Sequence, residues 1–86
     1  MLSVVRDGAS YIIAINSRYS DKSGWAFTRT RYDCANGLHQ VLGSSFTFDG
    51  MLKEKPEPYL TSLVPGSART ITGEIACAAT GSRLQL

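Results

Sequence analysis

The sequence predicts a small α+β domain in which a twisted antiparallel sheet of four to six strands, arranged as a meander, carries one C-terminal α-helix. Two observations favour this fold. Segments rich in β-branched and aromatic residues recur at short intervals in the first half of the chain, separated by turn residues. The last third contains a serine suited to capping a helix, followed by apolar residues at helical spacing. The chain has 86 residues, too few for a second core, so residues 1–86 are expected to form one domain.

The first two strands are expected at residues 2–6 and 10–19. The Asp7–Gly8 pair between them is typical of a tight hairpin turn. The second segment is rich in β-branched and aromatic residues, which favour a strand. The polar stretch SDKSG at 20–24 then turns the chain.

Two further strands are expected at residues 25–34 and 38–48. The ANG turn at 35–37 joins them, and its glycine suits a positive φ. Gly43, inside the second of these strands, indicates a β-bulge. Residues along the first strand alternate between two faces. One face carries Trp25, Phe27, Arg29 and Arg31, and the other carries Ala26, Thr28, Thr30 and Tyr32.

The remainder of the chain is expected to contain a loop, a short extended piece and the helix. Residues 49–59 are polar and hold two prolines, which predicts a surface loop, and residues 59–64 follow as the extended piece. Ser67 is a favourable N-cap, and Gly81 is a natural helix stop. Ile71, Ile75, Ala78 and Ala79 fall on one helical face, and Ile71, Ile75 and Ala78 are expected to cover Ile12, Val41 and Leu42 on the sheet.

Composition and charge exclude several function classes. Nine basic and seven acidic residues give a net charge of +2, and the basic residues form no run, so nucleic acid is not an expected partner. No apolar segment is long enough to span a membrane. At the N-terminus, Arg6 and Asp7 come before any apolar run long enough for a signal peptide. Two hypotheses remain open: a mature or trimmed chain that acquired Met1, or a cytosolic protein for which Met1 is the native start.

Catalytic, metal and cofactor sites have little support in the sequence. Cys34 and the single histidine, His39, lie across a predicted turn, but no further catalytic motif accompanies them. Two cysteines and one histidine provide at most three cysteine or histidine ligands for a metal ion, and their spacing is not that of a metal site. No phosphate-binding glycine loop is present. The sequence therefore predicts a protein without enzymatic activity, metal or cofactor.

A disulfide between Cys34 and Cys77 is the favoured interpretation of the two cysteines. A small exported domain buries too little apolar surface to be very stable, and a disulfide commonly compensates for this. Closing a loop of this length contributes about 4 kcal/mol in the chain-entropy model. Two reduced, buried thiols in a cytosolic protein are the alternative.

Arginine and aromatic side chains in consecutive predicted strands indicate a surface for binding a protein partner. Both kinds of residue are enriched at protein interfaces. An ordinary solvated face with extended arginines is the alternative interpretation. The candidate binding residues are Arg18, Tyr19, Trp25, Arg29 and Arg31, with Lys22 nearby.

Several segments together resemble the surface-adhesin protein E family of exported bacterial proteins. They are the opening VVRDGASYIIAINSRYSD, the run RYDCANGLHQVLGSSFTFDG, a polar loop, and LVPGSARTITGEIAC. The resemblance implies an antiparallel sheet with a C-terminal helix, export, a Cys34–Cys77 disulfide and binding of host or matrix proteins. The matching positions are Tyr32, Asp33 and Cys34, then Val41, Leu42, Ser44, Ser45 and Phe46, then Pro65, Gly66, Ser67 and Cys77.

Three functional hypotheses follow. The first is a non-enzymatic, adhesin-like protein of the bacterial envelope, located in the periplasm, at the outer membrane or at the cell surface, which binds a protein through its strands and loops. The second is a cytosolic inhibitor or regulator encoded by a phage or mobile element. The third is an enzyme that uses Cys34 and His39. A free-thiol count separates them, because only the first requires both cysteines to be oxidised. The sequence does not decide between a monomer and a homodimer.

Overall fold

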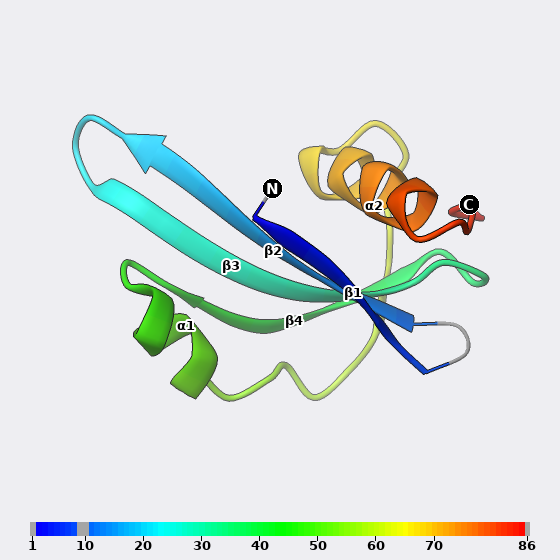
Figure 1. Cartoon of the computed structure of the whole chain (residues 1–86), viewed down its shortest axis with the longest axis horizontal. Helices are drawn as coiled ribbons and strands as arrows, with labels where there is room; N and C mark the ends of the chain where they lie inside the picture. The colour runs from blue at the N-terminus through cyan, green and yellow to red at the C-terminus, as the bar shows by residue number, and fades with distance from the viewer. Residues whose placement is uncertain (1, 9–10, 86) are drawn as a thin grey trace.

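Five antiparallel strands form one sheet in the computed structural model, which describes residues 2–8 and 11–85. The strands are β1 (Ser3–Asp7), β2 (Tyr11–Ser20), β3 (Gly24–Asp33), β4 (Leu38–Ser45) and β5 (Thr61–Ser62), and each pairs with its neighbour in the chain. The predicted meander is therefore confirmed (Figure 1). Ser10, expected to begin the second strand, lies outside the described residues.

The turns between the strands have the chemistry that the sequence predicts. Gly24 and Gly37 adopt φ values of 73° and 65°, which a residue with a Cβ adopts only at a cost. In the β3–β4 turn the Asp33 carboxylate accepts hydrogen bonds from the backbone and side chain of Asn36, at 3.3 and 2.8 Å. The backbone N–H of Gly37 donates to the Asp33 carbonyl at 3.0 Å, which closes the turn.

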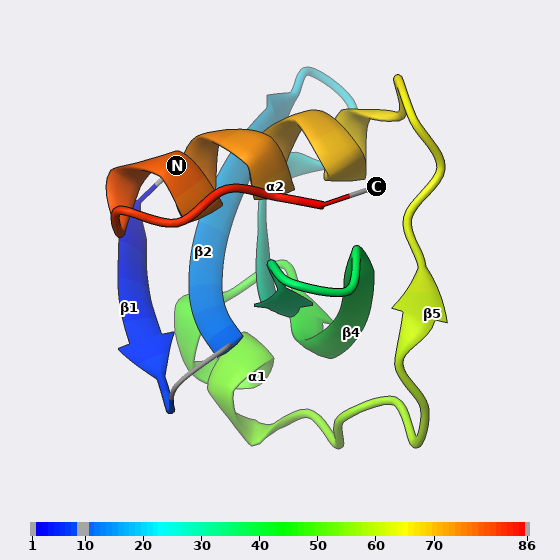
Figure 2. The same cartoon turned by 90° about the vertical axis from the view of Figure 1, so that its right-hand side faces the viewer.

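Two helices lie on opposite sides of the sheet. In Figure 1 and Figure 2, α2 (Ala68–Ala79) lies above the strands and α1 (Phe48–Lys53) below them. Because directly paired residues project to the same side of a sheet, the register assigns each strand residue to one side. We call the side under α2 the helix face and the other side the open face. Neither helix of the described chain is long and apolar enough to cross a membrane.

The hydrophobic core lies between the helix face and α2. It contains side chains from β2, β3, α2 and the segments that follow β3 and β5, with Val4 and Leu84 packed at its border. Arg6 at the edge of the sheet donates to the carbonyl of Thr80, just after the end of α2. The buried members of this core are Ile12, Ala14, Tyr32, Cys34, Leu63, Ala76 and Cys77.

The ends of α2 agree with the prediction. The Ser67 side chain caps the helix by accepting from the N–H of Thr70 at 3.2 Å. Gly81 follows the helix with a φ of 79° and its N–H donates to the carbonyl of Ala78 at 3.1 Å. The helix that was predicted from the capping serine and the terminating glycine is therefore confirmed.

The predicted buried face of α2 is wrong. Ile71 and Ile75 are 49% and 57% exposed, and both predicted alanines of that face are exposed as well. The residues turned to the sheet are instead Thr70, Gly73, Ala76 and Cys77. Of the sheet residues expected beneath the helix, Ile12 belongs to this core, whereas Val41 is half-buried and Leu42 is buried outside it.

A close contact explains the glycine within α2. A Cβ on Gly73 would lie 2.7 Å from Cε1 of Tyr32, closer than two carbon atoms can approach. Tyr32 is almost fully buried, and its hydroxyl donates to the carbonyl of Arg69 at 3.0 Å, so its ring has little freedom to move away. Gly73 weakens the isolated helix but lets it approach the sheet.

The expected loop at 49–59 is wrong in its first part. The strand predicted to reach residue 48 ends at Ser45, and α1 follows, with Thr47 capping it through a 3.0 Å bond from the N–H of Gly50. Met51 is completely buried and accounts for the formation of this short helix. Residues 54–60 are irregular and exposed, and β5 lies within the expected extended piece at 59–64.

The bulge expected near Gly43 is present. Val41 pairs with Thr30 and Gly43 pairs with Arg29, so Leu42 is the extra residue. The carbonyl of Met51 occupies the position that a Cβ on Gly43 would need. The bulge and the missing side chain therefore let α1 rest directly on β4.

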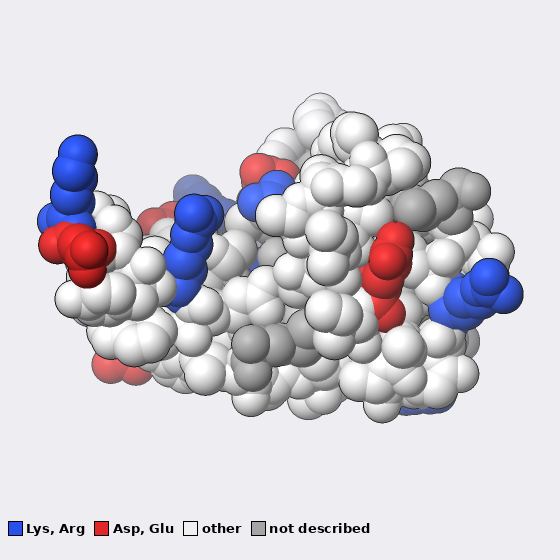
Figure 3. All heavy atoms as spheres, turned by 90° about the horizontal axis from the view of Figure 1, so that it is seen from above, with Lys and Arg blue, Asp and Glu red and all other residues white. Residues whose placement is uncertain are grey.

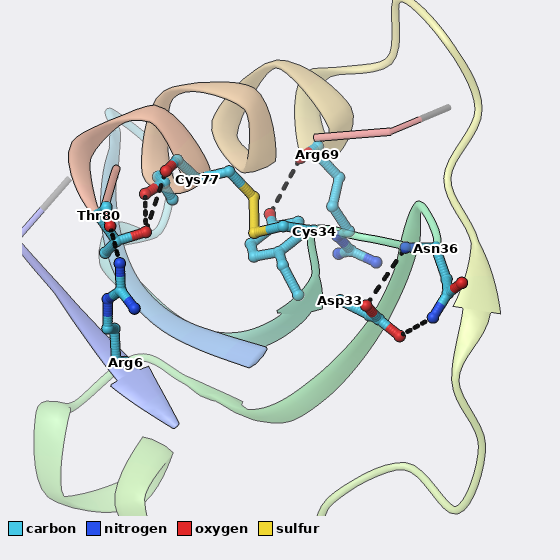
Figure 4. Close-up of a disulfide and its surroundings, with 9 residues drawn as sticks. Arg6, Asp33, Cys34, Asn36, Arg69, Cys77 and Thr80 are labelled. Atoms are coloured by element: carbon cyan, nitrogen blue, oxygen red, sulfur yellow. Dashed lines mark hydrogen bonds between the residues drawn. A yellow bond between two sulfur atoms is a disulfide. The ribbon is translucent and has the colours of Figure 1, made fainter. Parts of the chain in front are cut away.

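The predicted disulfide between Cys34 and Cys77 is confirmed. It joins the residue after β3 to the third turn of α2, with Cα atoms 6.1 Å apart, and both cysteines are buried (Figure 4). The C-terminal tail returns to the same place, where the N–H of Gln85 donates to the Cys34 carbonyl at 2.7 Å. The disulfide thus connects the sheet to the helix, and a hydrogen bond holds the end of the chain at the same place.

Replacement of both cysteines by alanine is expected to reduce the free energy of unfolding by about 4 kcal/mol, because the unfolded chain regains the freedom that a closed loop removes. Urea unfolding followed by circular dichroism measures the change. Oxidised and dithiothreitol-treated wild type form the matched control, since reduction should lower stability by a similar amount without changing the sequence. A loss below about 1 kcal/mol in both comparisons would contradict the prediction.

Candidate functional site

An exposed aromatic pair lies on the open face at the end of the β2–β3 hairpin. Tyr19 and Trp25 are directly paired across the strands, and their rings meet edge to face with centroids 5.4 Å apart. They are 59% and 53% exposed, although each ring carries a large apolar surface. The pair is held in place by the hairpin and remains available to a partner.

Further apolar residues extend this surface along the sheet. Val5 is 53% exposed, and its paired neighbour Ile13 is half-buried on the same side. Phe27 stacks edge to face on Phe48 of α1 at 5.9 Å, which links the strands to the short helix. The candidate list from the sequence missed these residues, although strand alternation and register could have found those in the sheet. The open-face patch consists of Val5, Ile13, Ile15, Tyr19, Trp25, Phe27, Arg29 and Arg31.

The two arginines of this patch have different surroundings. The Arg31 guanidinium forms an ion pair with Asp7 at 3.0 Å, and its Cζ lies 5.8 Å from the centre of the Tyr11 ring. These contacts occupy Arg31 within the molecule. Arg29 is half-buried and makes no ion pair with any residue that the structure describes. Of the two, Arg29 is therefore the one whose charge is not paired with a carboxylate of the described residues.

The five candidate binding residues do not form one surface. Tyr19, Trp25, Arg29 and Arg31 share the open face, but Arg18 pairs with Ala26 and projects from the helix face. The reason is the two-residue period of a strand, which sends consecutive side chains to opposite sides. Arg18 and Tyr19 are neighbours in the chain and so belong to different surfaces.

Arg18 instead lines a groove between the β2–β3 hairpin and the first half of α2. The groove has a volume of about 900 Å³, and Figure 3 looks down on this side of the molecule. Its lining includes Thr28 from the sheet and Arg69 from the helix, and no acidic residue of the described chain contributes to it. The helix face thus carries a concave surface, separate from the open-face patch, that the sequence did not predict.

His39 lies beside this helix, near Arg69. Its Nε2 is 3.3 Å from Nη1 of Arg69, and burial followed by the positive charge of Arg69 lowers the pKa of His39 below its usual value of 6.5. Cys34 is in the disulfide, so the Cys34–His39 hypothesis lacks the free thiol that it requires. Among residues 2–8 and 11–85, no group of three or more His, Cys, Asp or Glu side chains is placed to hold a metal ion.

Burial also raises the pKa of Tyr32. The neighbouring Arg69 charge and a hydrogen bond with Thr30 lower this pKa, but their effect is smaller than that of burial. Tyr32 is thus held as a neutral phenol at neutral pH, which suits its packing under α2. It is a core residue whose hydroxyl donates to the carbonyl of Arg69.

Comparison with known proteins finds no counterpart: no family model, no curated protein and no solved structure matches the chain. The resemblance to the surface-adhesin protein E family therefore remains a prediction from the quoted segments. The functional interpretation depends on the geometry of the two surfaces.

The pKa of His39 is expected to lie below 6.5, because burial and Arg69 both disfavour the charged ring. Since the unfolded chain then binds the proton more tightly, this histidine contributes stability above pH 6.5 that is lost as the pH falls through the folded-state pKa. NMR titration of the ring proton measures the pKa. Arg69→Gln should raise it, and Arg83→Gln, the removal of a distant charge, should not. A wild-type pKa at or above 6.5 would contradict the assignment.

Proposed function

We propose that this protein is a non-enzymatic, adhesin-like protein of the bacterial envelope, exported from the cytoplasm, which binds a host or matrix protein through its open-face patch. The observation that carries the proposal is the exposed pair of Tyr19 and Trp25 on a hairpin of a sheet that is disulfide-bonded to α2. Aromatic side chains and arginine supply most of the binding energy at many protein interfaces. The open face carries two aromatic residues, Tyr19 and Trp25, together with an arginine, Arg29.

The arrangement of the patch supports recognition of a folded partner. Tyr19 and Trp25 restrict each other through their edge-to-face contact, so little side-chain freedom is lost when a partner covers them. Phe27 is the next residue on the same face of β3 after Trp25, and the half-buried Ile15 and Ile13 continue the apolar surface along β2. A partner that covers the patch removes this apolar surface from water, at about 25 cal/mol for each Å².

The irregular segment 54–60 is the adaptable rim in this proposal. It is shorter than the loop expected at 49–59. Its residues are exposed, and it is attached to β4 through Glu57, whose N–H donates to the Val41 carbonyl at 2.9 Å and whose carbonyl accepts from the Gln40 side chain. A segment anchored at one point can adjust on either side of it. Such loops commonly complete a binding surface.

The disulfide supports the exported location. Disulfides persist in oxidising compartments and are rare in the cytosol, so the alternative, a cytosolic regulator encoded by a phage or mobile element, leaves this bond without a suitable environment. Both proposals use protein–protein contacts and differ mainly in compartment.

The compartment is tested by thiol labelling in the source cell. Cells are quenched in acid, treated with a maleimide reagent that adds mass under denaturing conditions, and the protein is detected by immunoblot. We expect no labelling without a reductant and two labels after reduction, because both cysteines are paired. Two labels without a reductant would favour the cytosolic alternative and leave the binding surface to be judged by its own experiment.

The binding surface is tested with purified extracellular-matrix proteins immobilised for biolayer interferometry. Tyr19→Ala and Trp25→Ala should each raise the dissociation constant by about tenfold or more, because each removes a central aromatic anchor. Both residues are more than half exposed, so the free energy of unfolding should change by less than about 1 kcal/mol. Arg29→Ala should weaken binding to a smaller extent.

Val64→Ala is the matched control, since Val64 is 67% exposed but lies between β5 and α2, outside both the patch and segment 54–60. Its dissociation constant should stay within about twofold of the wild-type value, as expected for an exposed residue outside the central anchors. Equal binding by wild type and the Tyr19 and Trp25 variants would eliminate the open-face patch as the interface. Trp25 is the single tryptophan of the chain, so its fluorescence also reports occupancy of the patch.

A further inference from the structure

The groove on the helix face is a concave surface, separate from the open-face patch. We propose that it binds an extended, acidic peptide segment of a protein partner. The groove is bounded on one side by the β2–β3 hairpin and on the other by the first half of α2, and its volume of about 900 Å³ is large enough for several residues of extended chain. It lies on the opposite side of the sheet from Tyr19 and Trp25, so the two surfaces can be occupied independently.

Charge is the first property that selects the occupant. Arg18 lines the groove from the hairpin and Arg69 from the helix, so each wall carries an arginine; Nη1 of Arg69 also contacts Nε2 of His39. Neither arginine is paired with a carboxylate of residues 2–8 or 11–85, and no acidic residue lines the groove. Two cations without counter-charges across one groove are complementary to a ligand with spaced carboxylates.

The uncharged lining fits the backbone and small side chains of a peptide. Ala26 and Ile75 provide apolar surface on the two walls, and Thr28 contributes a hydroxyl group. Asn16 also lines the groove, and its Oδ1 has no hydrogen-bond partner among the described residues. Rotation of this amide toward the groove would let it accept from a peptide N–H, as amide side chains commonly do.

The same features disfavour nucleic acid as the occupant. Tight binding to a phosphate backbone requires many neutralising contacts, whereas this groove offers two arginines. Binding of a single strand further depends on aromatic side chains on which the bases stack. Among the described residues that line the groove, Tyr32 is the only aromatic one, and it is 1% exposed beneath α2.

The experiment uses a fluorescein-labelled decapeptide of alternating Glu and Ala, with a peptide of alternating Gln and Ala as its uncharged counterpart. Fluorescence anisotropy with the full, oxidised chain measures both dissociation constants. The acidic peptide should bind at least about tenfold more tightly, since hydrogen bonds to charged groups are worth more than neutral ones. Binding should weaken as salt is added.

Variants locate the site. Arg18→Gln should weaken binding of the acidic peptide several-fold, and Arg18→Gln with Arg69→Gln should weaken it by about tenfold or more. The matched control is Lys53→Gln with Arg83→Gln, which removes two positive charges that do not line the groove and should change the affinity less than about twofold. Urea unfolding of each variant confirms that it is folded, and Arg18→Gln alone retains the contact between Arg69 and His39.

Several results would overturn the proposal. These are no binding of the acidic peptide at about 1 mM, equal affinity for the uncharged peptide, or an equal loss in the control variant. Tighter binding of an oligodeoxythymidylate of about twelve nucleotides would assign the groove to single-stranded nucleic acid instead. Tyr19→Ala should leave peptide binding unchanged, so failure of this inference and failure of the open-face proposal can be told apart.

Discussion

The Cys34–Cys77 disulfide is the constraint on which the rest of the structure depends. The disulfide holds Cys77 toward the sheet. Because a helix is rigid, this orientation of Cys77 also turns Gly73 and Ala76 to the sheet. The isoleucines of the predicted face then point to solvent. Without the covalent bond, burial of Ile71 and Ile75 would favour a different rotation of the helix. Gly73 completes the arrangement, since a larger residue there could not approach the Tyr32 ring.

Much of the fold was predictable because local chemistry decides it. Alternation, glycine turns and the Ser67 cap act over a few residues and need no knowledge of tertiary contacts. The rotation of α2 was not predictable from periodicity, because the apolar period and the cysteine favour different faces. The short helix α1 was missed because the prolines and charged residues of 49–59 indicated a loop, whereas a helix of six residues depends on tertiary contacts such as the complete burial of Met51.

The candidate site was predictable in composition and not in arrangement. Clustering of arginine and aromatic residues indicated the hairpin, and four of the five named residues do share one face. Alternation alone would have separated Arg18 from Tyr19, so that error was avoidable. The groove could not be foreseen, because it requires the position of α2 relative to the hairpin, which long-range packing and the disulfide determine.

The groove results from the difference in length between α2 and the β2–β3 hairpin. A helix of twelve residues extends about 18 Å, whereas a strand of ten residues extends about 33 Å. The disulfide anchors α2 at the Cys34 end of β3, so even a well-aligned helix leaves the far part of the β2–β3 hairpin uncovered. One side of that uncovered part, with the first half of α2, forms the arginine groove, and the other side presents Tyr19 and Trp25. A longer α2 would therefore fill the groove without affecting the aromatic pair, so helix length determines the groove alone, and the exposure of the pair on the other face is independent of it.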